Sequence, residues 1–267
     1  MANNTPVHFF DLLSELPGKS WSPSTFKTRL AMNYKGIPYT QSFISYPDIA
    51  PLLTSLSVPP HPEGGAHTAY TLPAIIHPSV TSTPTGALMD SLSIARHLDE
   101  QFPERPLFPS GDASYALAVA ADRIMHDVAV VGYGLLFTAI TDHLDPRGRE
   151  YFIRTRAEMF GKPVAEMRPT DEERVKLIEK MKEEMKPVVD ILKGRDGKKG
   201  PFLEGQTLGY ADLVVQSYLT WFKIVEKGIW RELIELGDGK VKAFWDACYP
   251  WVEGHGEDKD WEVPRSH

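Results

Sequence analysis

The sequence contains only one cysteine, Cys248, in 267 residues. A single cysteine cannot form an internal disulfide, and it cannot supply a CxxC redox motif or a cysteine-based zinc site. This usage is typical of a reducing compartment, so we expect a cytoplasmic protein. Any thiol chemistry must then come from a ligand, because Cys248 lies near the far end of the chain and is expected to be buried or inert.

An excess of positive charge and a long apolar run are absent as well. The net charge is −7 and no sustained basic stripe occurs, which argues against a nucleic-acid partner. The longest uncharged apolar segment lies between Asp127 and Asp142, and it is too short to cross a bilayer comfortably. The start of the chain has no basic region followed by an apolar one. We therefore expect no membrane association.

What the sequence does contain is enough hydrophobic residues, 42%, for a substantial core in one large domain or two ordinary ones. Residues 1–107 mix short apolar runs with proline and glycine breaks, whereas residues 112–267 are dominated by helical patterns. The closely spaced prolines of residues 101–109 cannot continue a helix and mark the linker. The predicted fold class is an α/β unit followed by an all-α unit.

The patterns also predict individual elements. In the first half we expect strands near 7–12, 39–44, 73–77 and 86–88, and helices near 23–35 and 90–101. Residues 46–71 are expected to be irregular, because prolines and glycines cluster there. In the second half we expect one long helix or a kinked pair over 115–143, a charged amphipathic helix over 171–193, and a helix from Tyr210 to about Lys227.

The start of the first predicted helix contains Ser22 and Pro23, which follow an apolar strand and precede the helical spacing of residues 26–34. Proline suits the first turn of a helix and serine suits the N-cap, so a capped helix is the plain interpretation. The unpaired N–H groups and the positive end of the helix dipole also favour an anion at this place. If that anion were a thiolate, the Ser22 hydroxyl could donate a hydrogen bond to it.

Three further motifs, together with Ser22-Pro23, point to one family. They are Tyr70-Thr71-Leu72-Pro73-Ala74, the segment from Met89 to Leu98 that opens with Asp90-Ser91, and the segment from Pro201 to Asp212. In this order they resemble the cytosolic glutathione transferases over essentially the whole chain. The serine before Pro23 is similar to serine-type members. The long 46–71 insert is similar to the fungal-specific class A enzymes and to bacterial β-etherases.

The resemblance implies a thioredoxin-like glutathione-binding domain over residues 1–107 and an all-helical domain over 112–267 that contributes a hydrophobic acceptor site. It implies glutathione as co-substrate, no metal, and a homodimer. Ser22 would donate to the glutathione sulfur, and Ser24 or Thr25 in the same turn could replace or assist it. A Ser-His-Asp triad is not needed, because the serine is a donor and not the nucleophile.

The other glutathione contacts carried over by the resemblance each have a plain alternative. Asp90 and Ser91 match the pair that holds the γ-glutamyl end, but Asp-Ser is also an ordinary helix cap. The backbone of Leu72 would pair with the backbone of the glutathione cysteine. The Leu72–Pro73 bond would be cis, although most X-Pro bonds are trans. Relatives often carry a lysine where Thr71 stands, so the residue that binds the glycyl carboxylate stays open. The candidates are Arg29, Lys27, His61 and His67.

The second substrate is the least defined part of the prediction. An aromatic-rich apolar pocket would suit flat aromatic acceptors, although most such side chains would otherwise be core. Conjugation, peroxide reduction and cleavage of an aryl ether all use the same thiolate, and the sequence does not choose among them. The alternatives to an enzyme are a ligandin-type carrier of aromatic metabolites and a non-enzymatic regulatory relative. The expected pocket residues are Phe10, Trp21, Tyr46, Met125, His126, Ala129 and Tyr133.

Overall fold

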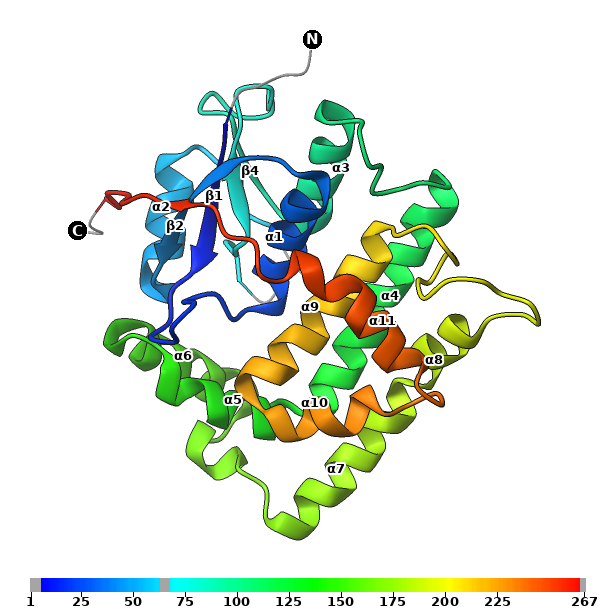
Figure 1. Ribbon diagram of the computed structural model, residues 1–267. Helices are drawn as coiled ribbons and strands as arrows, with labels where there is room; N and C mark the ends of the chain where they lie inside the picture. Colours follow the sequence, from blue (N-terminus) through cyan, green and yellow to red (C-terminus); the bar gives the residue numbers. More distant parts are fainter. Residues whose placement is uncertain (1–5, 63–67, 265–267) are drawn as a thin grey trace. The chain divides into compact units, whose positions relative to one another are not determined.

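The computed structural model describes residues 6–62 and 68–264, and the chain divides into two compact units (Figure 1). The first unit contains the described residues up to Arg105, together with residues 143–152 and the described residues from Gly254 onward. The second unit contains residues 106–142 and 153–253. The sequence patterns placed 143–152 and the C-terminal residues in the helical half, whereas in the structure both segments pack with the α/β half.

The first unit is built on a mixed five-stranded sheet with the order β4-β3-β1-β2-β5. Strand β1 pairs in parallel with β2 and antiparallel with β3, and β4 pairs antiparallel with β3. The strands are β1 (Val7–Leu12), β2 (Tyr39–Ile44), β3 (Ala74–Ile76), β4 (Ala87–Met89) and β5 (Glu257–Asp258). All six residues of β1 are buried, as expected for a central strand that is covered on both faces.

Successive side chains of β1 point to opposite faces of this sheet. The ring of Phe9 faces the guanidinium of Arg29 on α1, at 5.3 Å, and α1 (Pro23–Lys35) packs beside α3 (Ser91–Gln101). Helix α1 starts at its predicted proline and ends at Gly36, which adopts φ 68 as a left-handed cap. The insert that was expected to be irregular contains η1 (Tyr46–Asp48) and α2 (Ile49–Ser55). That expectation is therefore wrong for residues 46–55.

Strand β5 is an addition that the periodicity did not indicate, because it is only two residues long. It pairs in parallel with β2, with Gln41 opposite Asp258. The following residues continue along the unit, where the ring of Trp261 stacks on His8 at 4.7 Å and meets Phe10 edge-on at 4.9 Å. The C-terminal segment thus covers a sheet edge that would otherwise present unpaired backbone groups.

The second unit is helical and has α9 (Tyr210–Val225) at its centre. Residues 210–222 of α9 are all buried, and the helix packs against α4, α5, α10 and α11. The carboxylate of Asp212 holds the start of α9, because it accepts hydrogen bonds from the N–H groups of Gly209 and Leu203 at 2.8 and 2.7 Å. The helices around α9 are α4 (Asp112–Val131), α5 (Tyr133–Ile140), α7 (Asp171–Glu184), α8 (Lys186–Lys193), α10 (Lys227–Ile234) and α11 (Lys240–Cys248).

Three helical expectations need correction or refinement. The segment 115–143 is a kinked pair, since α4 ends at Val131 and α5 starts at Tyr133, with Gly132 between them and η2 (Thr141–His143) after α5. A Cβ atom at Gly132 would lie 2.8 Å from Met181 Sδ, so the glycine at the break lets the Met181 side chain pack closely. The segment 171–193 is broken at Met185 into α7 and α8. Five elements of the second half had no sequence prediction, namely α6 (Pro146–Phe160), η3 (Val164–Met167), α10, α11 and η4 (Tyr249–Trp251).

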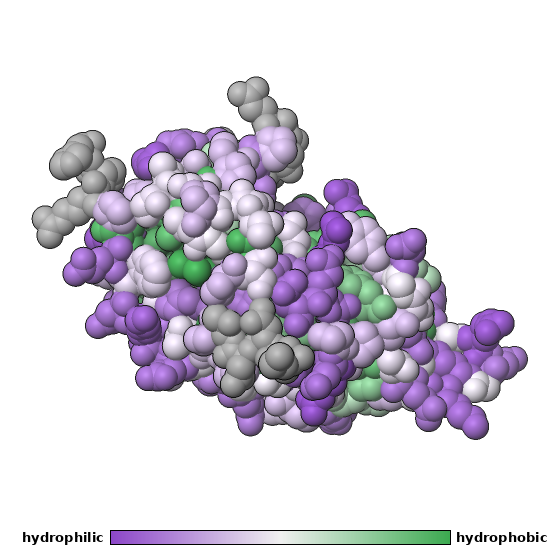
Figure 2. Space-filling view, turned by 90° about the horizontal axis from the view of Figure 1, so that it is seen from above, coloured by the Kyte–Doolittle hydropathy of each residue, from purple (hydrophilic) through white to green (hydrophobic). Residues whose placement is uncertain are grey.

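Among the described helices, none is by itself long and apolar enough to cross a membrane. The α4 segment and the segment Tyr133–His143 meet the length and composition criteria only together, and they are bent by 78° at their junction. On the face drawn in Figure 2, hydrophobic residues form small groups separated by hydrophilic ones.

Candidate active site

The sheet register of the first unit brings three predicted motifs to one end of the sheet. Phe10, near the end of β1, lies opposite Ala74 at the start of β3, and Ala74 lies opposite Met89 at the end of β4. Three segments therefore meet at this end of the sheet: the loop that leads from β1 to Ser22, the residues before β3, and the residues after β4. Ends of neighbouring strands are a frequent place for ligand sites in α/β units.

Ser22 occupies the N-cap position of α1 with an extended backbone, φ −73 and ψ 132, and is 5% exposed. Its side chain makes no capping hydrogen bond, although the N-cap is where serine usually does so. The Ser22 carbonyl instead accepts from the N–H of Phe26 at 3.0 Å and from the hydroxyl of Thr25 at 3.2 Å. Within the described residues, the Ser22 hydroxyl is therefore left available, and the plain capping interpretation does not apply to it.

The neighbouring hydroxyls in the first turn are placed differently. Thr25 is fully buried, and its hydroxyl is used by the Ser22 carbonyl, which leaves Thr25 poorly placed for a ligand. Ser24 is partly exposed and stands one position inside the helix. Pro23 has no N–H, and in the described structure the N–H groups of Ser24 and Thr25 have no hydrogen-bond acceptor. The positive end of α1 is thus open to an anion next to Ser22.

The Leu72–Pro73 peptide bond is cis, which confirms the prediction drawn from the family resemblance. Leu72 is 4% exposed and lies just before β3, at the end of the sheet where β1 and β4 finish. Among the described residues, neither the N–H nor the carbonyl of Leu72 has a backbone partner. Both groups are available to pair with an extended peptide that lies beside Leu72.

Asp90 and Ser91 start α3. Asp90 accepts a hydrogen bond from the N–H of Ser93 at 2.8 Å, so it is a helix cap, as its alternative interpretation proposed. Its backbone adopts φ 85 and ψ 123, a conformation that a residue other than glycine adopts only when its surroundings impose it. Backbone strain of this kind is often found at ligand sites.

The structure distinguishes among the residues proposed to bind the glycyl carboxylate of glutathione. The imidazole Nε2 of His61 lies 2.9 Å from the hydroxyl of Thr71, directly before Leu72. Arg29 is fully buried and forms an ion pair with Asp11 at 2.7 Å, so its placement does not fit the role suggested for it. Lys27 is 5% exposed and has an interaction of its own. His67 lies outside the described residues.

An aromatic group of the first unit adjoins Ser22. The rings of Trp21 and Tyr46 lie 6.3 Å apart, and Tyr46 stacks on Tyr151 at 5.9 Å with 11° between the ring planes. The indole Nε1 of Trp21 is buried and has no hydrogen-bond partner among the described residues. Sequence reasoning missed Tyr151 and Phe152, because no helix was predicted over residues 146–160 and they lie over a hundred residues from Tyr46.

Phe10 does not belong to this group. It is fully buried and packs against His8 and Trp261, so it is part of the core beside the C-terminal segment. The suggestion that Phe10 lines an acceptor pocket is therefore not supported by its placement.

The second unit contains the other four suggested pocket residues. Met125 and Ala129 are 0% and 1% exposed, so they are core residues of α4. His126 and Tyr133 are partly exposed and belong to an aromatic cluster in which Tyr133 stacks on Phe137 at 4.3 Å. Burial raises the pKa of the Tyr133 phenol, and nearby Arg156 opposes that rise.

Comparison with known proteins decides the family. Residues 21–101 match the sequence model of the glutathione S-transferase N-terminal domain, and residues 116–251 match that of the glutathione S-transferase C-terminal domain. The chain belongs to the glutathione S-transferase family. The glutathione S-transferase-like protein ustS of Aspergillus flavus is 54% identical over 267 residues, which cover 98% of this chain and 96% of that protein.

Solved glutathione S-transferases share the fold. The transferase CsGST63524 of Ceriporiopsis subvermispora, solved in complex with glutathione, is 30% identical with a TM-score of 0.81, covering 92% of this chain and 97% of that one. GSTFuA2 of Phanerochaete chrysosporium is 28% identical with a TM-score of 0.79, covering 94% and 99%. These matches confirm the predicted family, its similarity to fungal class A members and the fold class, a thioredoxin-like unit followed by a glutathione S-transferase helical domain.

Proposed function

We propose that this glutathione S-transferase binds glutathione at the end of the sheet described above and activates its thiol with the Ser22 hydroxyl. The observation that carries the proposal is the Ser22 side chain, which stands at the start of α1 without a capping bond. The helix N–H groups beside it are open as well. A thiolate placed there would accept the hydroxyl hydrogen and face the positive end of the helix.

The energies are sufficient for this role. A free thiol has a pKa of about 8.5, so lowering that pKa by about 2 units requires roughly 2.7 kcal/mol of selective stabilisation of the anion. A hydrogen bond to a charged group contributes about 1.5 to 3 kcal/mol, and a helix N-terminus adds about 0.3 to 1 kcal/mol. Ser22 and the start of α1 together can therefore keep most of the bound thiol ionised at neutral pH.

The other proposed contacts bind the three residues of glutathione in turn. In the proposal, Leu72 pairs with the cysteinyl backbone, and Asp90 with Ser91 holds the charged γ-glutamyl end. Asp90 has the acceptor chemistry for the α-ammonium group, and Ser91 lies at the positive start of α3, which suits the α-carboxylate. His61, held by Thr71 beside Leu72, is the candidate for the glycyl carboxylate.

The second substrate is proposed to be a hydrophobic electrophile, with an aromatic one favoured. Trp21, next to Ser22 in the chain, is buried, and the partly exposed rings of Tyr46 and Tyr151 beyond it supply aromatic surface that suits flat aromatic ligands. In a conjugation the thiol proton leaves to solvent, a carbon–sulfur bond forms, and the bond from that carbon to its leaving group breaks. An aryl ether would be cleaved by the same attack, with a phenolate or alkoxide as the leaving group.

The test is steady-state conjugation of glutathione to a halonitrobenzene by the wild-type protein, Ser22→Ala and Ser24→Ala. We expect Ser22→Ala to lower kcat/KM by about one to two orders of magnitude, as expected from the loss of a hydrogen bond to a charged group. Ser24→Ala is the matched control and should stay near wild type. Equal losses in both variants, or a loss only in Ser24→Ala, would reject Ser22 as the donor. Ligand binding without conjugation in the wild-type protein would favour a carrier.

A homodimer and a cytoplasmic location complete the proposal, and both are supported by family membership alone. Sedimentation velocity of the purified protein would test the dimer directly.

A further inference from the structure

The loop that leads from β1 to Ser22 has little regular structure of its own. Its internal bonds include one from the Ser14 hydroxyl to the Lys19 carbonyl at 2.6 Å. Lys19 adopts φ 55, a left-handed conformation that is unfavourable for a residue other than glycine. Contacts with other segments add to these internal bonds in holding the loop, and with it Ser22, in place.

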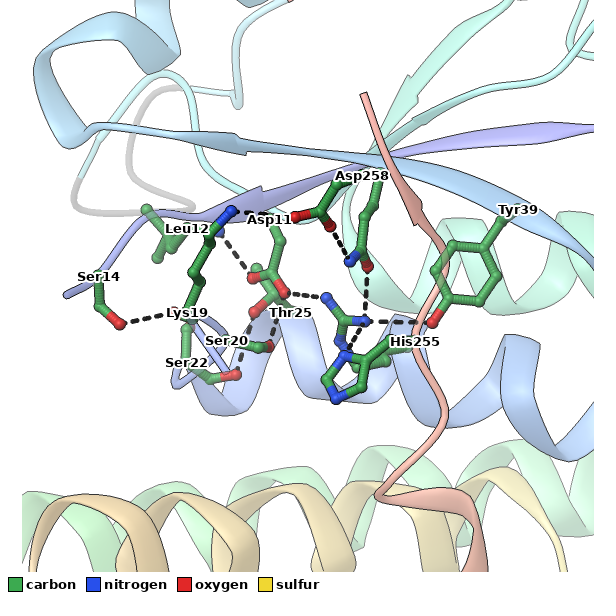
Figure 3. A network of polar contacts seen from close by, with 12 residues as sticks. Asp11, Leu12, Ser14, Lys19, Ser20, Ser22, Thr25, Tyr39, His255 and Asp258 are labelled. Carbon is green, nitrogen blue, oxygen red and sulfur yellow. Dashed lines mark hydrogen bonds and ion pairs between the residues drawn. The ribbon is translucent and has the colours of Figure 1, made fainter. Parts of the chain in front are cut away.

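One such contact comes from the C-terminal segment. The ammonium of Lys19 forms an ion pair with Asp258 of β5 at 3.0 Å (Figure 3). It also lies 5.0 Å from the centre of the Phe43 ring. The other oxygen of Asp258 accepts a hydrogen bond from the Gln41 amide at 2.6 Å. Asp258 thus connects the strained residue of the loop to β2.

A second connection runs through buried groups to Ser20, two residues before Ser22. Arg29 donates to Gln41 Oε1 at 2.7 Å and to Asp11 at 2.7 Å, and the same Asp11 oxygen accepts from the Ser20 hydroxyl at 2.6 Å. His255 of the C-terminal segment lies 3.2 Å from Arg29 through its Nδ1 (Figure 3). Asp11 and Arg29 are both fully buried, so this connection is shielded from solvent.

The C-terminal segment packs tightly against α1 and β2. A Cβ atom at Gly254 would lie 2.6 Å from Asn33 on α1, and one at Gly256 would lie 2.6 Å from the Tyr39 carbonyl on β2. The Asn33 side chain also donates to the Gly254 carbonyl at 2.9 Å. A side chain at Gly256 would meet the backbone of β2, and one at Gly254 would displace the Asn33 side chain. The close approach at both glycines therefore helps to fix where Asp258 and His255 lie.

We propose that the C-terminal segment, residues 254–261, braces the loop that carries Ser22, and that Asp258 is a positioning residue for the reaction. The inference rests on the role proposed for Ser22. It follows from two polar connections that leave the same segment and reach the loop at Lys19 and at Ser20. A segment that only covered the edge of β2 would need neither of them.

The experiment measures the ultraviolet absorbance of the thiolate of bound glutathione against pH in the full-length protein. Asp258→Ala removes the contact with Lys19, and Gly256→Ala displaces the segment without altering any polar side chain. We expect both variants to raise the pKa of the bound thiol toward the Ser22→Ala value. At a pH below that pKa, kcat should fall about two- to fivefold, the range for losing an exposed ion pair. The Kd for glutathione, measured by calorimetry at a pH below the wild-type thiol pKa so that the bound thiol is protonated in every variant, should stay at the wild-type value, because Leu72, Asp90 and Ser91 lie on other elements.

The matched control is Asp246→Ala. Asp246 forms an ion pair with Lys242 at 2.6 Å, and the exposures of that pair, 59% and 56%, are close to the 56% and 46% of Asp258 and Lys19. The control variant should keep the wild-type thiol pKa. If Asp258→Ala and Gly256→Ala keep that pKa while Ser22→Ala raises it, the brace is rejected and the role of Ser22 stands. If Ser22→Ala also leaves the pKa unchanged, the proposed function and the brace fail together.

Discussion

At the scale of single residues, the chemistry of the site depends on which polar groups are already in use. Ser22 and Thr25 share one helical turn. The Thr25 hydroxyl donates a hydrogen bond to the Ser22 carbonyl, whereas the Ser22 hydroxyl makes no capping hydrogen bond. Arg29 likewise lies on the same helix, but Asp11 and Gln41 occupy its guanidinium. Ser22 therefore differs from its neighbours less in residue type than in having a side chain that is not already hydrogen-bonded and can donate to a ligand.

His61 provides a prediction for glutathione binding. If its imidazole binds the glycyl carboxylate, His61→Ala should raise the Kd for glutathione about tenfold or more, the range for a hydrogen bond to a charged group. The thiol pKa should remain unchanged, because Ser22 is untouched. Calorimetry with glutathione and with a glutathione analogue amidated at glycine measures the effect. An equal loss for both ligands in His61→Ala would place His61 elsewhere.

His8 provides a prediction for stability against pH. The Ser42 hydroxyl donates to the Lys259 carbonyl, so its oxygen accepts from His8 Nε2–H at 3.0 Å, and Nδ1 accepts from the Thr40 hydroxyl at 2.7 Å. The neutral ring is thus the form that fits. Burial, and then the charge of Lys259, lowers the pKa of His8 from 6.5 to about 4.

The unfolded chain takes up a proton at His8 below pH 6.5, whereas the folded protein does so only near pH 4. The free energy of unfolding should therefore fall as the pH decreases through this range, by about 2 kcal/mol between pH 7 and pH 5 from His8 alone. Urea unfolding of the wild-type protein and of His8→Leu measures this. The variant should lose about that much of the pH dependence, and an unchanged dependence would contradict the assignment.

Residue identities could be predicted where a local motif specifies them. Ser22 before Pro23 and the cap at Asp90 were visible in the sequence, because each depends on its immediate neighbours. The cis bond before Pro73 was predicted only from the family resemblance, because most X-Pro bonds are trans. The pairing of Arg29 with Asp11 was not visible, since it depends on how α1 packs on β1. The stacking of Tyr46 on Tyr151 was hidden for the same reason.

At the scale of elements, prediction succeeded where a pattern was long and bounded. Helix α1 has a proline at its start and a glycine at its end, and β1 is a continuous apolar run. Helix α2 was missed because seven residues among prolines give too short a pattern. Strand β5 has only two exposed residues and no apolar signal, so only its pairing with β2 reveals it.

The start of α9 gives a prediction at this scale. Burial raises the pKa of Asp212 to about 7, and its side chain accepts hydrogen bonds from two backbone N–H groups. Asp212→Ala leaves both N–H groups buried without an acceptor, which should lower the free energy of unfolding by about 2 to 4 kcal/mol. Asp212→Asn keeps an acceptor oxygen and should lose less. Urea unfolding at one pH compares them, and equal losses would show that the hydrogen bonds are not the cause.

At the scale of the whole molecule, the two units are not two consecutive stretches of chain. The sequence texture changes near residue 107, and the described residues of the first unit indeed run to Arg105 before the chain leaves it. The returns of residues 143–152 and of the C-terminal segment could not be predicted, because neither carries an α/β pattern. Their place follows from contacts such as Asp48 with Arg147 at 2.6 Å and Gln41 with Asp258 at 2.6 Å.

This organisation predicts that residues 1–107 do not fold alone. Without the two returning segments, the edge of β2 is uncovered, Tyr46 loses Tyr151, and Phe10 loses Trp261. Circular dichroism and urea titration of the isolated fragment should show no cooperative transition. A fragment that unfolds cooperatively and binds glutathione would show that the returning segments are dispensable.

The central claim is that the Ser22 hydroxyl lowers the pKa of the glutathione thiol, and titration of the bound thiolate by its ultraviolet absorbance tests it most directly. The wild-type protein and Ser24→Ala should both show a thiol pKa about 2 units below the free value of about 8.5, and Ser22→Ala should return it most of the way to that value. An identical thiol pKa in the wild-type protein and in Ser22→Ala would contradict the claim.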